Sequence, residues 1–387
     1  MTRWVWGGVD ADPDVYHSMA EEAAPANRPR QSSGTRHTNC DLQMVPVSIP
    51  DPRMHWRLRL ADMAIRWRFK RHAERPLDVP WARERIGRPL WMRRVITLPV
   101  QRVEVELPSH TIEILSPPLR ASANALLPVE RVVLYVHGGG FIACSPSTHR
   151  PLAARIAREW RAMVIVPDYR LAPEHPFPSG RNDVLATYRW ILETLAVPAE
   201  HVVFAGDSAG GGLAVSAALA CLEQGLPVPG AIVAFSPWTD LTCSGASLVD
   251  NIERCAMFVP SQLHSAAQLY AGDTSRDDPG VSPLHADLSS LPPLCLHVSL
   301  DELLRDDTLR LAERARAAGV LVRCRAWPAV PHVWQFLAGW LPEARDSLDD
   351  ARDFVMQHVP AATLAELPAT LARQVRHRVP RTSPHGA

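Results

Sequence analysis

The stretch that decides the fold is "AGDSAGGG", residues 205–212. It contains the pattern Gly-x-Ser-x-Gly around Ser208. An apolar run typical of a strand, "HVVFAGD", precedes it, and a run typical of a helix, "GLAVSAALACLEQG", follows. The five-residue pattern alone is weak, because small residues produce it by chance. A strand, a tight glycine-rich turn and a helix together are the setting of a nucleophile elbow, which holds a serine exposed on a strained turn. This context makes Ser208 a candidate nucleophile rather than a simple helix cap.

A regular alternation of strands and helices surrounds this turn. Apolar runs predict strands at 131–137, 162–169, 201–207, 231–237, 294–300 and 321–328. Helical stretches are expected at 150–160, 181–196, 209–224, 303–318 and 343–358. Continuous apolar strands that alternate with helices indicate a mostly parallel sheet with helices on both faces. The sequence therefore predicts an α/β protein, and two shorter strand runs, "VQRVEVEL" and "TIEILSPP", precede this core.

The chain divides by composition into four regions. Residues 1–48 mix Pro, Asp, Ser, Thr and Arg without a period, which predicts a poorly ordered leader, and residues 361–387 form a similar tail. Residues 96–360 carry the strand–helix alternation and form the expected catalytic domain. Its stretch 239–285 is too long for a connecting loop, so we expect an inserted cap element there. The remaining region, 49–95, is the expected N-terminal helical part of the cap.

Within that N-terminal region, residues 55–73 predict a basic amphipathic helix. Its apolar residues lie at positions 56, 60, 63, 64 and 67, with Arg59, Arg66 and Lys70 on the other side. Such a helix can lie on a membrane or cover a hydrophobic groove of its own protein. We favour the groove. The residues then expected to line a pocket under the cap are Trp56, Met63, Trp67, Met257 and Phe258.

Composition excludes several classes of function. The 387 residues include 41 basic and 41 acidic side chains, so the formal net charge is zero and no attraction to nucleic acid is implied. The seven cysteines are odd in number and never spaced as Cys-x-x-Cys, which favours a reduced, cytoplasmic setting. No apolar run is long enough to span a bilayer, so we expect no stable membrane insertion. No metal site or cofactor is expected, and a homodimer is compatible with the sequence.

A glycine run supplies the second candidate element. The stretch "LYVHGGGFIACSP", residues 134–146, places three glycines after an apolar strand. Glycine there suggests that a substrate oxygen approaches the main chain, as in an oxyanion hole built from backbone N–H groups. The expected donors are the amides of Gly139, Gly140 and Ala209. The residues expected to support this loop without reacting are His137, Gly138 and Asp207.

A nucleophilic serine needs a base, and the base needs a carboxylate that orients it. In the expected chain order the histidine follows the last core strand, and His332 in "AVPHVWQFL" meets that requirement. The acid should lie at the end of the strand 294–300. Asp301 and Glu302 both lie there, and the residues alone leave the choice between them open. Two further acids, residues 306 and 307, begin a helix and are read as first-turn acids favoured by its dipole.

Taken together, these motifs resemble the hormone-sensitive-lipase-like branch of the α/β-hydrolases, the bacterial family IV esterases. The resemblance covers about residues 97–358 and rests on "HGGGF", "DYRLAPEHPFP", "GDSAGG", "SPWTDLT", "SPLHADLSSLPP" and "PHVWQF". It implies a cofactor-free carboxylesterase of small or short-acyl esters, and lactones are plausible substrates. Its acidic motif, set in register on Asp306, favours Glu302 as the acid, although aspartate is the family's usual residue. It also implies that Tyr169, Arg170 and Glu174 hydrogen-bond around the oxyanion loop.

The function expected from the sequence is acyl transfer from a small-molecule ester or lactone to water. An amide hydrolase would use the same groups. A non-catalytic ligand-binding module on this fold would be expected to lack part of the triad, whereas Ser208 and His332 are both present. A membrane-surface lipase would depend on the basic helix at 55–73.

Overall fold

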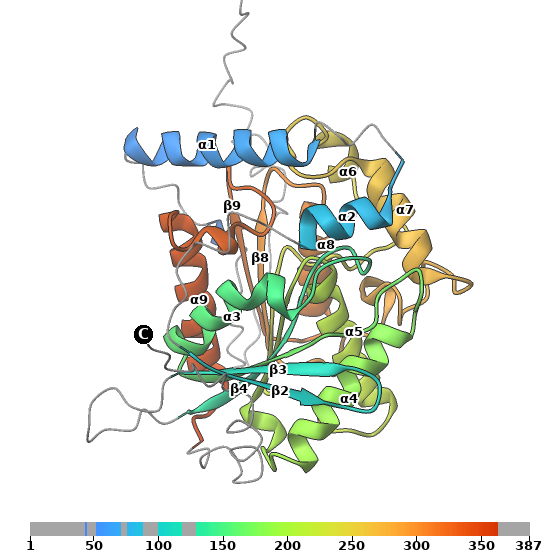
Figure 1. The fold of residues 1–387 in the computed structure, drawn as a ribbon, viewed down its shortest axis with the longest axis vertical. Coiled ribbons are helices and arrows are strands. Elements are labelled where there is room, and N and C mark those ends of the chain that lie inside the picture. Colours follow the sequence, from blue (N-terminus) through green and yellow to red (C-terminus); the bar gives the residue numbers. More distant parts are fainter. Residues whose placement is uncertain (1–42, 45–51, 71–75, 88–99, 118–128, 363–387) are drawn as a thin grey trace, which may run out of the picture. The chain divides into compact units, whose positions relative to one another are not determined.

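A β-sheet forms the centre of the computed structural model, which describes residues 43–44, 52–70, 76–87, 100–117 and 129–362. Within these residues the sheet has nine strands in the order β1-β9-β8-β7-β6-β4-β5-β3-β2. β2 pairs antiparallel with β3, β3 pairs antiparallel with β5, and the other pairs are parallel. The predicted mostly parallel α/β sheet is therefore confirmed (Figure 1). The strands are β1 (Gln43–Met44), β2 (Gln101–Glu106), β3 (Thr111–Ser116), β4 (Arg131–Val136), β5 (Ala162–Pro167), β6 (Val202–Asp207), β7 (Ala231–Phe235), β8 (Leu294–Ser299) and β9 (Val322–Trp327).

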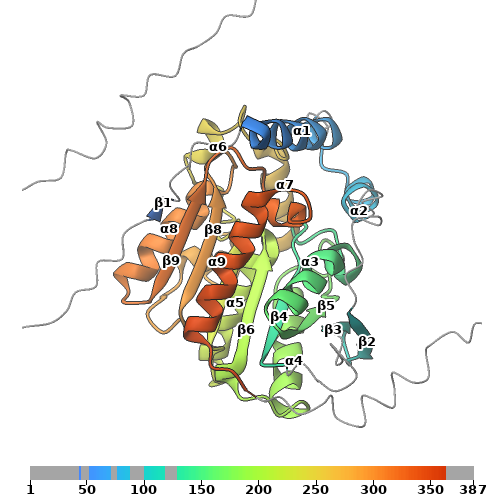
Figure 2. The same ribbon diagram turned by 90° about the vertical axis from the view of Figure 1, so that its left-hand side faces the viewer.

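Helices cover both faces of the sheet (Figure 2). Every residue of β4 to β8 is buried, which explains why these strands read as continuous apolar runs. One core forms between the sheet and α4 (Ser179–Glu193), α5 (Ala209–Glu223) and α8 (Arg305–Ala317). The other forms against α3 (Pro146–Glu159) and α9 (Pro342–His358). Alternate residues of one strand enter different cores, as Leu134 and Tyr135 of β4 do.

The cap elements come from two parts of the chain. The N-terminal part supplies α1 (Pro52–Arg68) and α2 (Val79–Gly87), and the insertion supplies α6 (Ser247–Asp250) and α7 (Pro260–Ala271). Short 3-10 turns occur at Ala199–His201, Pro283–His285 and Trp334–Leu337. Asp307, expected only as a first-turn acid, is also buried at the start of α8 and accepts hydrogen bonds from the Thr239 and Asp240 amides, each at 2.8 Å. It thereby fixes the start of the insertion to the sheet domain.

The N-terminal expectations change at one point. Gln43 and Met44, assigned above to the leader, form β1 and pair with Arg325 and Ala326 of β9. The reason is that β9 would otherwise present an unpaired edge, and any extended segment can supply its backbone hydrogen bonds. The rest of the expected leader, and the tail beyond residue 362, lie outside the described residues. In the part of the chain that the structure covers, none of the helices has the length and apolar character needed to cross a bilayer.

Two glycines, Gly206 and Gly210, have no side chains and so allow α5 to begin directly against the end of β4. A Cβ atom on Gly210 would lie 2.2 Å from the Val136 carbonyl oxygen and 2.4 Å from that of His137. A Cβ on Gly206 would lie 2.5 Å from the Gly210 carbonyl oxygen. Both contacts are with backbone, which cannot move aside as a flexible side chain can. The strand–turn–helix unit around Ser208 is therefore pressed onto the loop that follows β4.

We predict that Gly210→Ala lowers the free energy of unfolding by about 3 kcal/mol or more, because α5 must move away from the sheet. The matched control is Gly225→Ala, where an added Cβ meets no atom within 4 Å but the residue has φ of +64°. That variant should lose only about 1–2 kcal/mol, from its left-handed backbone. Denaturant unfolding of both variants measures the difference, and equal losses would contradict the close-packing explanation.

Candidate active site

Ser208 occupies a strained turn between β6 and α5. Its φ is 53° and its ψ is −126°, a conformation that non-glycine residues seldom adopt. Neighbouring backbone holds it there: the Ser208 amide donates to the Phe235 carbonyl at 2.8 Å, and the Trp238 amide donates to the Ser208 carbonyl at 2.9 Å. The side chain faces a cavity that also reaches Gly139, Gly140 and His332. The elbow predicted from the sequence is thus present.

The glycine loop lies opposite this turn and needs glycine for measurable reasons. Gly139 has φ of +115° and Gly140 has φ of +64°. A Cβ on Gly139 would lie 2.3 Å from the Ala143 carbonyl oxygen, and one on Gly138 would lie 2.3 Å from Asp207 Oδ2. Among the hydrogen bonds of the described residues, the amides of Gly139, Gly140 and Ala209 have no acceptor. These N–H groups are therefore available to an oxygen atom of a bound molecule.

Asp207 ties the glycine loop to the elbow from beneath. Its Oδ1 accepts hydrogen bonds from the Tyr135 hydroxyl at 2.8 Å and from the Gly138 amide at 3.2 Å, and the ring of His149 lies 3.2 Å away. Burial alone would raise the pKa of Asp207, but the His149 ring and the Tyr135 hydroxyl favour the charged form, and the pKa is lowered. The sequence did not predict these roles of Tyr135 and His149, because Tyr135 lies inside an apolar strand and His149 comes before the last core strand, after which the base is expected.

His137 orders the loop as expected. One ring nitrogen, Nδ1, lies 2.9 Å from the Gly138 carbonyl oxygen, and the ring stacks on Tyr169 at 4.2 Å between centroids. The Tyr169 hydroxyl donates to the His137 carbonyl at 2.8 Å. Burial lowers the pKa of His137 to about 3, so the ring is neutral near pH 7. His137 therefore holds the backbone of the glycine loop in place.

Arg170 and Glu174 of the "DYRLAPEHPFP" motif were expected to hydrogen-bond around the glycine loop, but neither side chain contacts it directly. The guanidinium of Arg170 pairs with Asp183 at 2.9 Å, away from the glycine loop. Glu174 pairs with Arg83 of α2, and Arg83 in turn donates to the carbonyls of Ile142, at 2.8 Å, and Ala172, at 3.0 Å. The contact that Glu174 makes with the loop region is thus indirect. No sequence motif identifies Arg83, because its partners include backbone carbonyls that lie far away along the chain.

The structure places Glu302, and not Asp301, against His332. Glu302 Oε2 is hydrogen-bonded to His332 Nδ1, and Glu302 Oε1 accepts the Ser299 amide at 3.0 Å. The Asp301 carboxylate turns outward, where it accepts the Ala329 amide at 2.8 Å. The other ring nitrogen of His332, Nε2, is buried and has no hydrogen-bond partner among the described residues. His332 lines the same cavity as Ser208.

The cavity has a volume of about 190 Å³ and apolar walls. Its lining includes Trp238, Phe336 and Leu337 from the sheet domain, Met257, Phe258, Leu263 and Ala266 from the insertion, and Ile65, Phe69 and Trp81 from the N-terminal cap elements. Met257 and Phe258 thus lie where the sequence placed them. Trp56, Met63 and Trp67 do not line this cavity. The side chains of Trp56, Met63 and Trp67 are exposed, and it is the opposite side of α1 that points inward.

Comparison with known proteins assigns this geometry to a family. A family model described as the α/β hydrolase fold matches residues 133–336, which include the glycine loop, Ser208 and His332. The crystal structure of a hormone-sensitive lipase from a metagenome library is similar, with 35% identity and a TM-score of 0.70 over 80% of this chain and 99% of that one. An esterase of the bacterial hormone-sensitive lipase family gives 34% identity and a TM-score of 0.69 over 78% and 98%. The chain is a hormone-sensitive-lipase-like α/β-hydrolase.

Relatives of this hydrolase carry names of one enzyme class. It is 40% identical over 225 residues to an acetyl-hydrolase of Streptomyces hygroscopicus, which is 58% of this chain and 75% of the relative. It is 31% identical over 377 residues to the carboxylesterase/phospholipase LipF of Mycobacterium tuberculosis, covering 94% of this chain and 97% of the relative. The hydrolase is therefore an enzyme of the esterase class.

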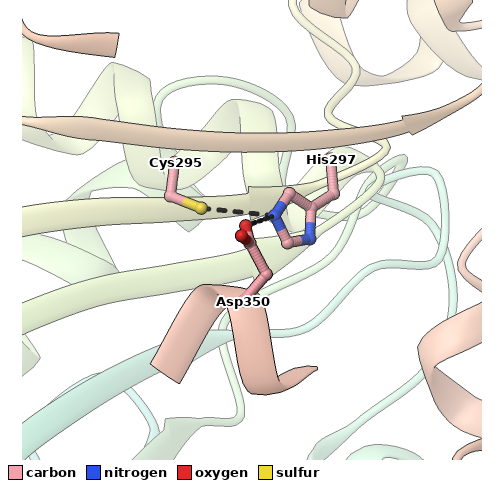
Figure 3. Close-up of side chains that lie close together, drawn as sticks. All are labelled: Cys295, His297 and Asp350. Carbon is pink, nitrogen blue, oxygen red and sulfur yellow. Dashed lines mark hydrogen bonds and ion pairs between the residues drawn. The ribbon is translucent and has the colours of Figure 1, made fainter. Parts of the chain in front are cut away.

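One further cluster in the hydrolase offers three atoms that could bind a metal (Figure 3). Cys295 and His297 of β8 and Asp350 of α9 place a sulfur, a nitrogen and an oxygen within 4.8 Å of one another, the only such group in the described residues. Asp350 also pairs with Arg325 at 2.7 Å and with Arg323 at 3.6 Å. Two guanidinium charges oppose a cation there, and burial raises the pKa of the Cys295 thiol. We interpret the cluster as a buried polar link between α9 and the sheet.

Proposed function

We propose that this hydrolase cleaves carboxylic esters of small or short-acyl substrates by acyl transfer to Ser208. One observation carries the proposal. The strained serine lines the same cavity as His332. The Nε2 atom of that ring has no hydrogen-bond partner among the described residues, and its Nδ1 atom is bonded to a buried glutamate. Nucleophile, base and orienting acid are thus supplied in the order that this chemistry requires.

The first step transfers the Ser208 hydroxyl proton to His332. His332 Nε2 takes the proton of Ser208 as Oγ attacks the ester carbonyl carbon. The imidazolium that forms is stabilised by Glu302, whose carboxylate also fixes the tautomer that leaves Nε2 free to accept. The hydrogen bond from the Ser299 amide holds the second carboxylate oxygen and so fixes the glutamate itself. Burial of the pair excludes water, which strengthens its electrostatic interaction.

The oxyanion is the second charge to be stabilised. We assign the amides of Gly139, Gly140 and Ala209 to the tetrahedral oxygen, since they have no protein acceptor and the first two belong to a loop that lines the cavity. Ala209 begins α5, so the helix dipole adds partial positive charge. Losing one such donor typically costs about 3 kcal/mol of barrier. That magnitude exceeds the cost of placing glycine in a loop, roughly 1 kcal/mol or less for each residue.

The reaction closes with hydrolysis of the acyl-enzyme. Imidazolium His332 gives its proton to the leaving alkoxide, so the alcohol departs and the acyl group remains on Ser208 Oγ. A water molecule then attacks the acyl carbon while His332 takes its proton. The second tetrahedral species breaks the bond to Oγ, the proton returns to Ser208, and the carboxylic acid is released.

The roles of the two neighbouring acids give a direct test. We predict that Glu302→Gln lowers kcat/KM by about 10³–10⁴-fold, because the amide no longer stabilises the imidazolium. Asp301→Asn is the matched control and should change kcat/KM by less than about threefold, since Asp301 contacts only loop groups. Steady-state hydrolysis of p-nitrophenyl acetate measures both, with thermal unfolding to confirm the fold. A larger loss in the Asp301 variant would contradict the assignment.

The apolar walls and limited volume of the cavity favour small acyl groups. We predict that kcat/KM falls as the acyl chain of a series of p-nitrophenyl esters lengthens, because the cavity of about 190 Å³ cannot accept a long chain. Ser208→Ala should lower kcat by at least about 10³-fold on every ester. Matched lactones and anilides run in parallel define the preferred bond. If the intact protein hydrolysed none of these substrates, the proposed reaction would be wrong.

A further inference from the structure

An apolar stripe runs along the outer face of α1. The exposed fractions are 47% for Trp56, 44% for Leu60, 56% for Met63 and 62% for Trp67. These positions are spaced by four, three and four residues, which places them on one side of a helix. They make up four of the eight exposed large hydrophobic residues among the described side chains, so the stripe is a patch rather than the usual scatter of single residues.

This stripe does not hold the helix on the protein. Leu58 and Ala61, on the opposite side, are buried, and Ile65 and Phe69 line the active-site cavity. The sequence pattern predicted that the stripe would cover a groove of the protein itself, and the structure turns it outward. Within the stripe, Trp56 makes an edge-on contact with Trp340 at 6.1 Å between ring centroids. The helix thus has one apolar face for the cavity and a second that faces outward.

Basic side chains lie along both flanks of the stripe. Between residues 56 and 70 the chain has five bases and one acid, Asp62. Among the described side chains, Arg66 is the one base of this stretch that pairs with a carboxylate, that of Asp62. Three others bond neutral backbone carbonyls: Arg57 that of Trp340, Arg68 that of Arg85, and Lys70 that of Ile252. A carbonyl orients a cation without cancelling its charge, so the face stays positive.

The loop beside α1 carries charges of both signs, because the exposed acid Glu253 precedes Arg254 there. Arg254 lies in the neighbouring loop and pairs loosely with Asp301 at 3.5 Å, and its side chain is 58% exposed. Asp250 of α6 pairs with Arg305 at 3.7 Å. Arg59, exposed on the edge of the stripe, has no acidic partner among the described residues. In a chain of zero net charge, this helix is a local concentration of positive charge.

We propose that the outer face of α1 docks on an anionic lipid surface. The apolar stripe would enter the boundary between headgroups and acyl chains, where tryptophan is favoured, and the flanking bases would contact anionic headgroups. A second copy of this chain fits the face less well, because a two-fold contact would place the same basic flanks against each other. The proposal concerns binding and does not depend on the reaction assigned to Ser208.

Docking would place the active-site cavity beside the lipid. One side of α1 carries the stripe and the other supplies Ile65 and Phe69 to the cavity wall, while Figure 1 shows α1 next to α6 and α2. Hydrogen bonds from Arg66 and Arg68 to the carbonyls of Glu253 and Arg85 join α1 to the turn after α6 and to α2. An ester that leaves the lipid surface would then meet the cap elements that surround the cavity.

Sedimentation with vesicles tests this proposal. The full-length protein is mixed with phosphatidylcholine vesicles that contain phosphatidylglycerol, and with pure phosphatidylcholine vesicles. We expect binding to the anionic vesicles that weakens as salt is raised, and weaker binding to the neutral ones. Leu60→Ser combined with Met63→Ser should reduce the binding constant about tenfold or more, because two apolar side chains are lost from the interface.

The matched control is Leu321→Ser combined with Met356→Ser. These two apolar residues are comparably exposed; Leu321 directly precedes β9 and Met356 lies in α9. This control should bind as the unmodified protein does, and both double variants should keep the rate of hydrolysis of a soluble ester. Failure of the unmodified protein to bind anionic vesicles, or equal losses in both double variants, would overturn the proposal. A dimer in sedimentation velocity that only the α1 variant dissociates would assign the face to a second copy instead.

Discussion

The contact between the start of α5 and the end of β4 is the constraint on which the site depends. Backbone meets backbone there, because Gly206 and Gly210 have no Cβ atoms to keep the elements apart. The approach forces Ser208 into a strained turn and brings the glycine loop opposite it. Strain of this kind persists only where surrounding structure holds it, and here the sheet core and the Phe235 and Trp238 backbone do so.

Two buried carboxylates then organise the polar groups. Asp207 joins β4, the glycine loop and α3 through Tyr135, Gly138 and His149, so that the loop cannot drift from the elbow. Glu302 joins the end of β8 to His332. An isolated charge in such a setting would be very unfavourable, and each carboxylate is satisfied by several hydrogen bonds. The polar network is therefore also a positioning device for the groups that face the cavity.

The helix α1 shows how a cap can serve two surfaces. A helix that is apolar on one side gives an unambiguous pattern, but α1 is apolar on both sides with bases between them. Sequence periodicity found the larger, outer stripe and assigned it to the interior. The inner face, with Leu58, Ala61 and Ile65, is made of smaller residues and gives a weaker signal. Which face turns inward is decided by the shape of the cavity and by hydrogen bonds to distant carbonyls such as that of Trp340.

The sequence by itself determined the sheet, its helices and the segments that carry Ser208, the glycines and His332, because apolar period, glycine and chain order are local properties. The residues alone left the acid open between Asp301 and Glu302, and only the family motif favoured Glu302. Neighbouring side chains project in different directions, and in the structure Glu302 is the one that contacts His332. The sequence also could not find Arg83, Tyr135 or His149, whose partners lie far along the chain. Tertiary structure decided these points, because hydrogen bonds between remote segments depend on distances that no local pattern encodes.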